Sequence, residues 1–285
     1  MARRDTSSTA VVGDDFEPVE PPVVDEEGIP SKCLSFVIKS DWGHFRRIDR
    51  TVTKQTYRLP PRTTIAGILA AIAGVRRDGY YDIFGPDVSA MAVTPLGQIR
   101  TLTQPTLGLG THPGETMDDA GGTGGKTLKV KYPDSTDNRQ IHSYELLVDP
   151  TYRIDIAVED ERFYTVLANR LKTGTSYYPP SMGMSEFLAW ITPADPAGGF
   201  EQRPERIEAS DTVVVNSAIP NGVDDIVPRP DVTYQVERVP GYMESHGRGR
   251  RTTGFVDYAL SEEPIEIRPN TTTPVDIGGH VVVFE

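Results

Sequence analysis

Helical periodicity is confined to two stretches of this sequence, which restricts the chain to folds in which β-strands form most of the core. The first helix is predicted over residues 61–75 (PRTTIAGILAAIAGV), where Pro61 precedes the apolar run and Thr63 and Thr64 are candidate caps. The second is predicted over residues 159–173, which begin with acidic residues and carry apolar side chains on one face. The 26 Gly and 24 Pro residues also favour turns and β-structure over a helical bundle.

Short apolar runs of strand type lie on both sides of each helix. They cover residues 32–40, 88–97, 141–158 (divided in two at Asp149–Pro150) and 184–191. The order strand, helix, strand, insertion, strand, helix, strand is the βαββαβ plan of ferredoxin-like domains. The predicted class is therefore α+β, with an RRM-like core of the type that many RNA-binding modules use.

Three further regions flank or interrupt this core. Residues 1–30 combine acidic residues with proline and lack apolar periodicity, which predicts a disordered tail before a domain over residues 31–195. Residues 98–140 are rich in Gly, Thr, Pro and Asp, and we expect them to form a projecting, thumb-like hairpin with a mobile tip. Residues 196–285 contain short strand-like runs between turn residues, which predicts a small antiparallel β elaboration.

Acidic residues outnumber basic ones in the whole chain but not in one segment. Asp and Glu total 41 against 29 Lys and Arg, a net charge of −12, and this favours a halophilic protein over an ordinary acidic one. Residues 39–62 instead hold seven Lys or Arg residues and two acids, a local charge of +5. Because arginine pairs bidentately with phosphate, this basic segment is a candidate phosphate-binding site. A solvated loop that balances neighbouring acids is the alternative.

Aromatic side chains interleave with these basic groups. Trp42, His44, Phe45 and Tyr57 offer flat faces on which splayed bases stack, although core packing explains Trp42 and Phe45 equally well. Arg62 stands at the start of the first predicted helix, where the N-terminus attracts anions. The combination favours binding of single-stranded RNA.

Four stretches of the chain, in this order, resemble the Cas five family, a subunit of the type I CRISPR surveillance complex called Cascade. They span residues 32–193 and read FVIKSDWGHFRR, YRLPPRTTIAGILAAIAG, YELLVDPTYRIDI and SYYPPSMGMSEFLAWI. The helix-start motif is the most specific of the four. The closest branch is similar to the type I-B proteins of salt-loving archaea, in agreement with the charge.

The resemblance implies a RAMP-type ferredoxin-like core with a thumb, and a non-catalytic role in antiviral defence. Such a protein binds the 5′ handle of the CRISPR RNA, caps the filament of the backbone subunit Cas seven and contacts the large subunit Cas eight. Cas six is a further expected partner. The glycine-rich turn of the family would match Gly174 to Gly183, where tight turns let the backbone approach a ligand.

The residues expected to contact RNA lie in the basic segment, at the start of the first helix, in the thumb and in a second basic cluster at residues 246–254. They are Lys39, Trp42, His44, Arg46, Arg47, Arg50, Lys54, Tyr57, Arg58, Arg62, Thr63, Lys126, Lys129, Lys131, Arg248 and Arg250. A solvated loop is an equally good interpretation of the second basic cluster.

One branch of the family is itself an endoribonuclease, and the resemblance therefore leaves an enzymatic alternative. That branch cuts precursor CRISPR RNA without a metal, through attack of a 2′-hydroxyl, with Tyr, Lys and His in key roles. Its adjacent Lys and His are absent from this sequence, so we expect no catalysis. In an enzyme, His44, Lys54 and Tyr57 would be the catalytic residues. A protein-only scaffold without RNA contact is a third interpretation.

No other motif indicates chemistry. The single cysteine, Cys33, excludes a disulfide framework and is predicted to be a small core residue. His112 and His142 match no metal-ligand spacing, and residues 121–125 (GGTGG) lack the context of a nucleotide-binding loop, so we expect neither a metal nor a cofactor. No apolar stretch reaches transmembrane length and the N-terminus lacks a signal-peptide core, which predicts a cytoplasmic protein without membrane contact.

Overall fold

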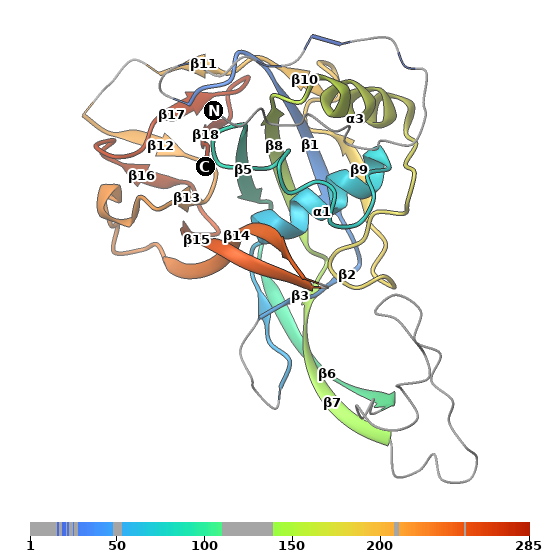
Figure 1. Cartoon of the computed structure of the whole chain (residues 1–285). Helices are drawn as coiled ribbons and strands as arrows, with labels where there is room; N and C mark the ends of the chain where they lie inside the picture. The colour runs from blue at the N-terminus through green and yellow to red at the C-terminus, as the bar shows by residue number, and fades with distance from the viewer. Residues whose placement is uncertain are drawn as a thin grey trace.

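The computed structural model describes residues 16, 19–20, 22, 25, 28–47, 53–109, 139–207, 211–247 and 249–285, and most of its regular elements are strands (Figure 1). The elements up to the second long helix are β1 (Cys33–Lys39), β2 (Trp42–Gly43), β3 (Phe45–Arg46), β4 (Thr56–Tyr57), α1 (Arg62–Ala73), β5 (Ser89–Pro95), β6 (Arg100–Leu109), β7 (Arg139–Val148), β8 (Thr151–Val158) and α3 (Glu161–Thr173). The later elements are β9 (Trp190–Pro193), β10 (Glu201–Gln202), β11 (Glu205–Arg206), β12 (Val213–Val215), β13 (Ile219–Pro220), the 3₁₀ turn η2 (Val223–Asp225), β14 (Gln235–His246), β15 (Gly249–Leu260), β16 (Ile265–Ile267), β17 (Pro274–Asp276) and β18 (Val281–Val283). The class is α+β, as the sequence predicts. No helix in the described part of the chain is long and apolar enough to cross a membrane.

A five-stranded antiparallel sheet forms the centre of the fold. Its order is β9–β1–β8–β5. β10 lies on the same edge of β1 as β9 and pairs with the first residues of β1, whereas β9 pairs with the later ones. The register between β1 and β8 runs from Leu34↔Ile156 to Lys39↔Thr151, and β5 pairs with the other side of β8. Along the chain, α1 connects β1 to β5 and α3 lies between β8 and β9, which is the predicted order of elements.

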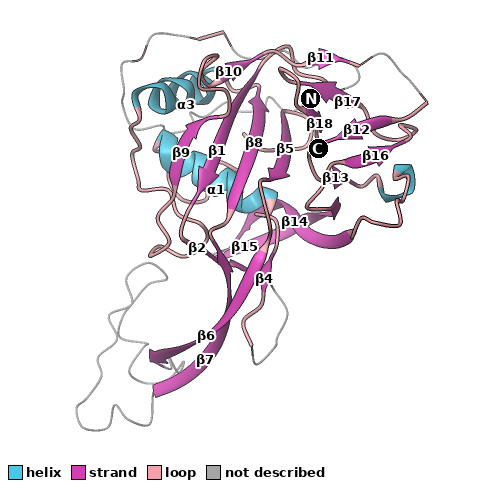
Figure 2. Cartoon of the chain, turned by 180° about the vertical axis from the view of Figure 1, so that it is seen from behind, coloured by secondary structure: helices cyan, strands magenta, loops and turns pink. Residues whose placement is uncertain are grey.

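One face of this sheet packs against the two long helices. Leu34, Phe36 and Ile38 alternate along β1 and share one buried cluster with Leu69 of α1 and Leu167 of α3. The period of two in a strand brings alternate side chains to the same face. α1 lies in front of the sheet in Figure 1 and behind it in Figure 2, which views the molecule from the other side. Burial of each such side chain stabilises the fold by about 2 kcal/mol.

The C-terminal region covers part of the opposite face of the sheet. Cys33, Ala92 and Ala157 lie there in a buried cluster with Ile277 and Val282, which come from the β17–β18 hairpin and its turn. Because the side chains on the sheet are small, the hairpin packs closely against it. Cys33 is fully buried, so its prediction as a core residue is confirmed.

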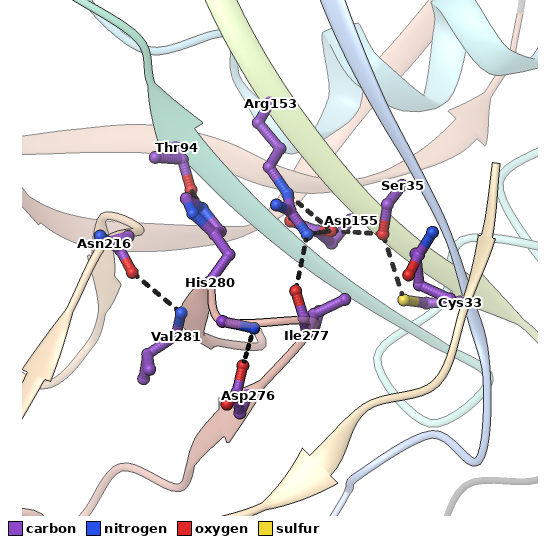
Figure 3. Close-up of polar contacts among 12 residues, drawn as sticks. Cys33, Ser35, Thr94, Arg153, Asp155, Asn216, Asp276, Ile277, His280 and Val281 are labelled. Atoms are coloured by element: carbon purple, nitrogen blue, oxygen red, sulfur yellow. Dashed lines mark hydrogen bonds and ion pairs between the residues drawn. The ribbon is translucent and has the colours of Figure 1, made fainter. Parts of the chain in front are cut away.

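Polar contacts connect the same hairpin to the sheet (Figure 3). The Arg153 guanidinium pairs with the Asp155 carboxylate at 2.9 Å and donates to the Ile277 carbonyl oxygen at 3.4 Å. Burial raises the pKa of Asp155, and the charge of Arg153 opposes that rise. His280 Nε2 lies 3.0 Å from the Thr94 hydroxyl, and burial lowers the pKa of this imidazole to about 4. The C-terminal hairpin is therefore joined to β5 and β8 by polar as well as apolar contacts.

β6 and β7 form a long antiparallel hairpin that projects from the body of the molecule (Figures 1 and 2). Its last described pair is Leu109↔Arg139, and β2 pairs with β7 near its base. A hairpin is predicted over residues 98–140, but the observed one is longer because β7 continues to Val148 instead of joining the central sheet. Residues 110–138, with Lys126, Lys129 and Lys131, lie outside the described part.

A second long hairpin, β14–β15, lies in the C-terminal region and packs against α1. Its strands close at His246↔Gly249. Of the two interpretations of the basic cluster at residues 246–254, the solvated loop is wrong for most of them, because they form part of β15. The short strands β10, β11, β13 and β17 were not predicted, since two or three residues are too few to display a period.

The two helices begin and end near the predicted residues. Asp160 caps α3, its carboxylate accepting a hydrogen bond of 2.7 Å from a first-turn N–H, and Gly174 ends the helix with a left-handed φ of 66°. α1 starts differently, because Pro61 is its N-cap and no side chain caps it. Thr63 and Thr64 are therefore wrong as predicted caps, since both already lie inside the first turn.

The last predicted strand of the core is shorter than expected. β9 covers Trp190–Pro193, whereas most of residues 184–189 form bends and turns. Phe187 and Ala189 nevertheless pack against the main core. The apolar residues of this turn face the core, and their pattern resembles that of a strand. The predicted strand therefore begins at residue 184, whereas β9 begins at Trp190.

The N-terminal segment contacts the core at several positions. Phe16 and Val19 pack against the main buried cluster, and the Val19 N–H donates to the Thr165 hydroxyl of α3 at 3.0 Å. Ile29 is also buried. The prediction of a disordered tail over residues 1–30 is wrong for these positions, because their apolar side chains find partners on the folded domain. Many of the other residues of this segment lie outside the described part.

Candidate nucleic-acid interface

The basic segment folds as a small hairpin beside β7. β3 and β4 pair at Phe45↔Tyr57 and Arg46↔Thr56, and both aromatic side chains are buried. The Thr56 N–H donates to Glu145 Oε2 on β7 at 3.1 Å. Core packing is therefore the role of Phe45 and Tyr57, which offer little face to a base.

Arg46 is the exposed arginine of this hairpin. Among the described residues, the ion pairs of the basic segment involve Arg58 and Arg62 and not Arg46. Arg47 is half-buried, with its guanidinium 5.4 Å from the centroid of the Tyr57 ring. Arg50 lies in the part of the loop that the structure does not describe. Arg46 consequently offers the most accessible guanidinium for a phosphate.

Lys54 joins the hairpin to the base of the projecting hairpin. Its N–H donates to the Ser143 carbonyl oxygen at 2.7 Å, and its own carbonyl accepts from the Glu145 N–H at 2.9 Å. Lys39 and Trp42 are exposed nearby, at the end of β1 and in β2. Two of the predicted RNA-binding residues, Trp42 and Lys54, thus lie beside β7 near the base of the β6–β7 hairpin.

Arg58 is held by two carboxylates. Its guanidinium lies 3.9 Å from Glu145 and 3.7 Å from Glu237, and its N–H donates to Glu237 Oε2 at 2.7 Å. Burial raises the pKa of Glu237, an effect that the contacts with Arg58 oppose. Much of the charge of Arg58 is therefore balanced within the protein.

Arg62 is wrong as a predicted RNA contact, because it is 1% exposed. Its guanidinium pairs with the Glu285 carboxylate at 2.9 Å, donates to the Ser89 hydroxyl at 2.5 Å and lies 5.1 Å from the centroid of the Tyr242 ring. The predicted position at the start of α1 is right, but the side chain turns inward. It connects α1 to β5 and to the last residue of the described chain.

His44 is also buried, at 3% exposure, beneath the predicted glycine-rich turn. Its Nδ1–H donates to the Glu145 carbonyl oxygen at 2.8 Å, and burial lowers the pKa of the ring. A Cβ atom on Gly183, whose φ is 93°, would lie 2.0 Å from the His44 carbonyl oxygen. The turn therefore needs glycine for its close approach to this chain's own backbone, where we had expected an approach to a ligand.

The remaining candidates are dispersed. Thr63 is half-buried and its hydroxyl donates to the Pro240 carbonyl oxygen at 3.4 Å. Arg250 is exposed on β15. Arg248 lies outside the described residues. These positions do not join the hairpin of Arg46 into one continuous site in the described structure.

Sequence reasoning missed two groups of residues at this interface. Glu145 and Glu237 position Arg58, but nothing local in the sequence distinguishes them from other acids. Leu107 and Ile141 face each other across the projecting hairpin, and Ile141 is 73% exposed. Apolar residues within a polar insertion were the available signal for this second pair.

One protein family and several solved structures match this chain. The family model described as CRISPR-associated protein (Cas_Cas5) matches residues 33–248. Among solved structures, the chain is similar to a CRISPR protein from Archaeoglobus fulgidus, with 14% identity, a TM-score of 0.50 and coverage of 88% of this chain and 98% of that one. It is also similar to a chain of a CRISPR RNA-guided surveillance complex, with 16% identity, a TM-score of 0.49 and coverage of 82% and 90%. No curated protein sequence matches it.

The central sheet, its two helices and the projecting hairpin define an α+β protein with a fold shared by CRISPR-associated proteins. Because the family model covers most of the chain, the protein belongs to the CRISPR-associated Cas five family. The family resemblance drawn from the sequence is thus confirmed. Its family places the protein among the subunits of CRISPR effector complexes. The type I-B, haloarchaeal branch stays a prediction.

Proposed function

We propose that this protein is a non-catalytic subunit of a type I Cascade complex that binds the 5′ handle of the CRISPR RNA. The observation that carries the proposal is the placement of Arg46, which is exposed on a hairpin whose aromatic residues are buried. That hairpin is fixed to β7 through Lys54, so its position relative to the projecting hairpin is defined. Phosphate contacts from such a rigid element fix the register of a bound RNA.

The architecture supports a ferredoxin-like core of RAMP type. The order β9–β1–β8–β5, with α1 and α3 as the two connecting helices, matches the βαββαβ plan. The β6–β7 hairpin is then the thumb, which wedges against the RNA beside the first Cas seven subunit. The protein caps the Cas seven filament and helps to seat the large subunit Cas eight, with Cas six as a further partner.

The proposed RNA-contacting set is narrower than the one expected from the sequence. It retains the accessible residues Lys39, Trp42, Arg46, Arg47, Lys54 and Arg250. Arg50, Lys126, Lys129, Lys131 and Arg248, which the structure does not describe, stay in the set on sequence grounds alone. Arg62, His44 and Tyr57 leave it because they are buried. Arg58 leaves it because two carboxylates balance its charge, and Thr63 because its hydroxyl donates to the Pro240 carbonyl oxygen.

The endoribonuclease alternative is disfavoured by the burial of its candidate residues. A general base or acid has to reach the reacting oxygen directly or through one water molecule. His44 and Tyr57 are 3% and 5% exposed, and the pKa of His44 is lowered by burial. A scissile phosphate would therefore reach neither side chain without a rearrangement of the β3–β4 hairpin.

Adaptation to high salt bears on the kind of RNA contact proposed. Electrostatic binding weakens with salt through counterion release, so bidentate arginine, stacking and shape gain importance. The chain contains 22 Arg and 7 Lys residues, in keeping with that requirement. The cytoplasmic location and the domain limits at residues 31–195 and 196–285 stay predictions.

The experiment is to purify the tagged protein with its complex in high salt and to sequence the RNA that accompanies it. We expect short RNAs that share one 5′ end. The double variant Arg46→Glu, Arg47→Glu should lose these RNAs while Cas seven still co-purifies, because it reverses the exposed charge of Arg46 and places a second negative charge beside it.

A matched control exists within the chain. Arg76 and Arg77 form an exposed Arg–Arg pair shortly after α1, away from the basic segment in sequence. Arg76→Glu, Arg77→Glu should leave the RNA bound. Retention of the RNA in the first double variant would contradict the proposed contact, and loss in both variants would show a general charge effect.

A further inference from the structure

The β17–β18 hairpin covers only part of the second face of the central sheet. At one end of the uncovered part, a basic and an aromatic residue lie side by side on neighbouring strands. Lys39 of β1 is the cross-strand partner of Trp190 on β9 and of Thr151 on β8. Directly opposed residues in antiparallel strands point to the same face. Counting along β1, this is the face of Cys33 and not that of Ile38. Trp190 is 51% exposed, so much of its indole is in contact with solvent.

A cavity of about 390 Å³ lies beside these two residues, Lys39 and Trp190. Its lining residues are Lys39, Ser40, Asp41, Asp149, Thr151 and Trp190. The volume falls in the range of small-molecule sites, which combine an apolar wall with a few polar groups. An exposed tryptophan supplies the wall here, and a lysine and two aspartates supply the polar groups.

The polar groups of the cavity differ in their availability. The Ser40 hydroxyl already donates to the Leu188 carbonyl oxygen at 2.8 Å. The Asp149 carboxylate is paired with Arg100 at 2.8 Å. Within the described residues, no ion pair is recorded for Lys39 or Asp41, and both are exposed. One carboxylate and one ammonium group beside the indole are thus accessible to a ligand.

The backbone holds Asp41 in place beside this wall. The Asp149 N–H donates to the Asp41 carbonyl oxygen at 2.9 Å, and the Ser40 N–H donates to the Pro150 carbonyl oxygen at 3.2 Å. The Ser40–Asp41 segment is therefore tied to the turn between β7 and β8. A carboxylate carried on such a fixed segment can select among ligands by hydrogen-bond geometry.

From this arrangement we infer that the Trp190 cavity binds one unpaired guanine base of a single-stranded RNA. The base stacks on the indole, and the Asp41 carboxylate accepts two hydrogen bonds, from N1–H and the exocyclic amino group. Lys39 contacts the phosphate or ribose of the same nucleotide. Uracil lacks an amino group and offers a single N–H donor on that edge, so it should bind more weakly.

This inference deepens the proposed function, since it names a base-reading site in a protein proposed to bind RNA through phosphate contacts. The two are nevertheless separable. The phosphate contacts depend on Arg46 of the β3–β4 hairpin, whereas the base site depends on Trp190 and Asp41 of the sheet and its adjoining turn. A variant at one site should leave the other site able to bind.

The test uses the fluorescence of Trp190 in the full chain. The sequence contains two tryptophans, so Trp42→Phe leaves Trp190 as the single reporter and keeps an aromatic ring at position 42, which is itself a proposed RNA contact. Guanosine and uridine 5′-monophosphates are titrated into this variant. We expect saturable quenching by both, with a dissociation constant about tenfold lower for the guanine nucleotide because of its second hydrogen bond to a carboxylate.

Two variants and one control complete the design. Asp41→Asn, in the Trp42→Phe background, should bring the two dissociation constants together, because an amide cannot accept both hydrogen bonds through equivalent oxygens. Trp190→Ala, followed by calorimetry, should weaken binding of both nucleotides by about tenfold. Leu188→Ala removes an exposed apolar side chain two positions before Trp190 in the sequence that does not line the cavity, and it should change neither constant.

Three results would overturn the inference. The first is the absence of saturable quenching by either nucleotide. The second is equal affinity for guanine and uracil nucleotides in the chain with Asp41 intact. The third is protection of Trp190 from acrylamide by a partner subunit in an RNA-free complex, which would make this surface a protein interface. In each case RNA binding through Arg46, measured by co-purification, would still decide the proposed function separately.

Discussion

Arg46 and Arg62 belong to the same basic segment, yet they lie in opposite environments. Arg46 is exposed on the β3–β4 hairpin, whereas Arg62 is 1% exposed and pairs with Glu285 at 2.9 Å. Between them, Arg58 is balanced by Glu145 and Glu237. The local charge of +5 therefore overstates what RNA can reach. One end of the segment is available to a ligand, and the other end is part of the core.

The largest effect is expected on stability, from a substitution of Arg62, the buried arginine of the basic segment. Arg62→Ala leaves the Glu285 carboxylate buried without its cation, and we expect the free energy of unfolding to fall by about 3–5 kcal/mol. Arg46→Ala should change it by less than about 0.5 kcal/mol, because an exposed side chain is removed. Chemical denaturation of both variants measures the difference. Similar losses in the two variants would contradict the comparison.

The next largest effect is expected at the turn around Gly183, which packs against the backbone of the basic segment at His44. Gly183→Ala places a Cβ atom 2.0 Å from the His44 carbonyl oxygen at a φ of 93°, and should destabilise the fold by about 3 kcal/mol. Gly199→Ala is the matched control, since its φ is 77° and nothing lies within 4 Å of the added atom. Strain alone should cost about 1 kcal/mol there. Thermal unfolding of the pair separates the clash from the strain.

A smaller effect is expected for Arg46, the exposed arginine of the basic segment, in the salt dependence of RNA binding. Arg46→Ala removes one phosphate contact, so the slope of log K against log salt should become shallower by about one unit. Arg77→Ala removes an exposed charge outside the basic segment, which pairs with Asp78, and should leave the slope unchanged. Filter binding over a salt series gives both slopes. An unchanged slope for the Arg46 variant would show that its guanidinium does not neutralise a phosphate.

The smallest effect is a pH dependence that separates folding from RNA binding. Burial lowers the pKa of His44 below its ordinary 6.5, so the folded chain binds this proton more weakly than the unfolded chain does. The neutral, buried imidazole of His44 therefore contributes fully to the free energy of unfolding above about pH 6.5, and this contribution is lost as the pH falls through the folded-state pKa. His44→Asn should flatten this part of the stability profile, as measured by thermal midpoints. The proposed phosphate contact of Arg46 does not involve this imidazole, so RNA binding should persist in the His44→Asn variant.

Local sequence patterns were sufficient for the order and type of the main elements. Strand alternation predicted β1 and β5, and helix signals placed α3 before Gly174. These patterns succeed because side-chain period and capping depend on residues a few positions apart. The same patterns failed at residues 184–189, where apolar side chains of a turn enter the core without forming a strand.

The sequence predicted the basic segment as the candidate site, but it did not predict which side chains of that segment are exposed. Charge and aromatic content identified the basic segment, and Arg46 and Trp42 are indeed exposed. The inward turn of Arg62 was not predictable, because its partner Glu285 lies more than two hundred positions away. Trp190, the wall of the inferred base site, was read only as part of a strand. Its exposure follows from the edge position of β9.

By itself, the sequence determined the α+β class, the family resemblance and the existence of one concentrated positive segment. Those features are local, or are carried by ordered motifs, and need no knowledge of distant contacts. The tertiary structure decided which of the positive charges remain accessible and which face of the sheet the C-terminal hairpin covers. The physical reason is that burial and charge pairing depend on segments far apart in the chain, which only packing brings together.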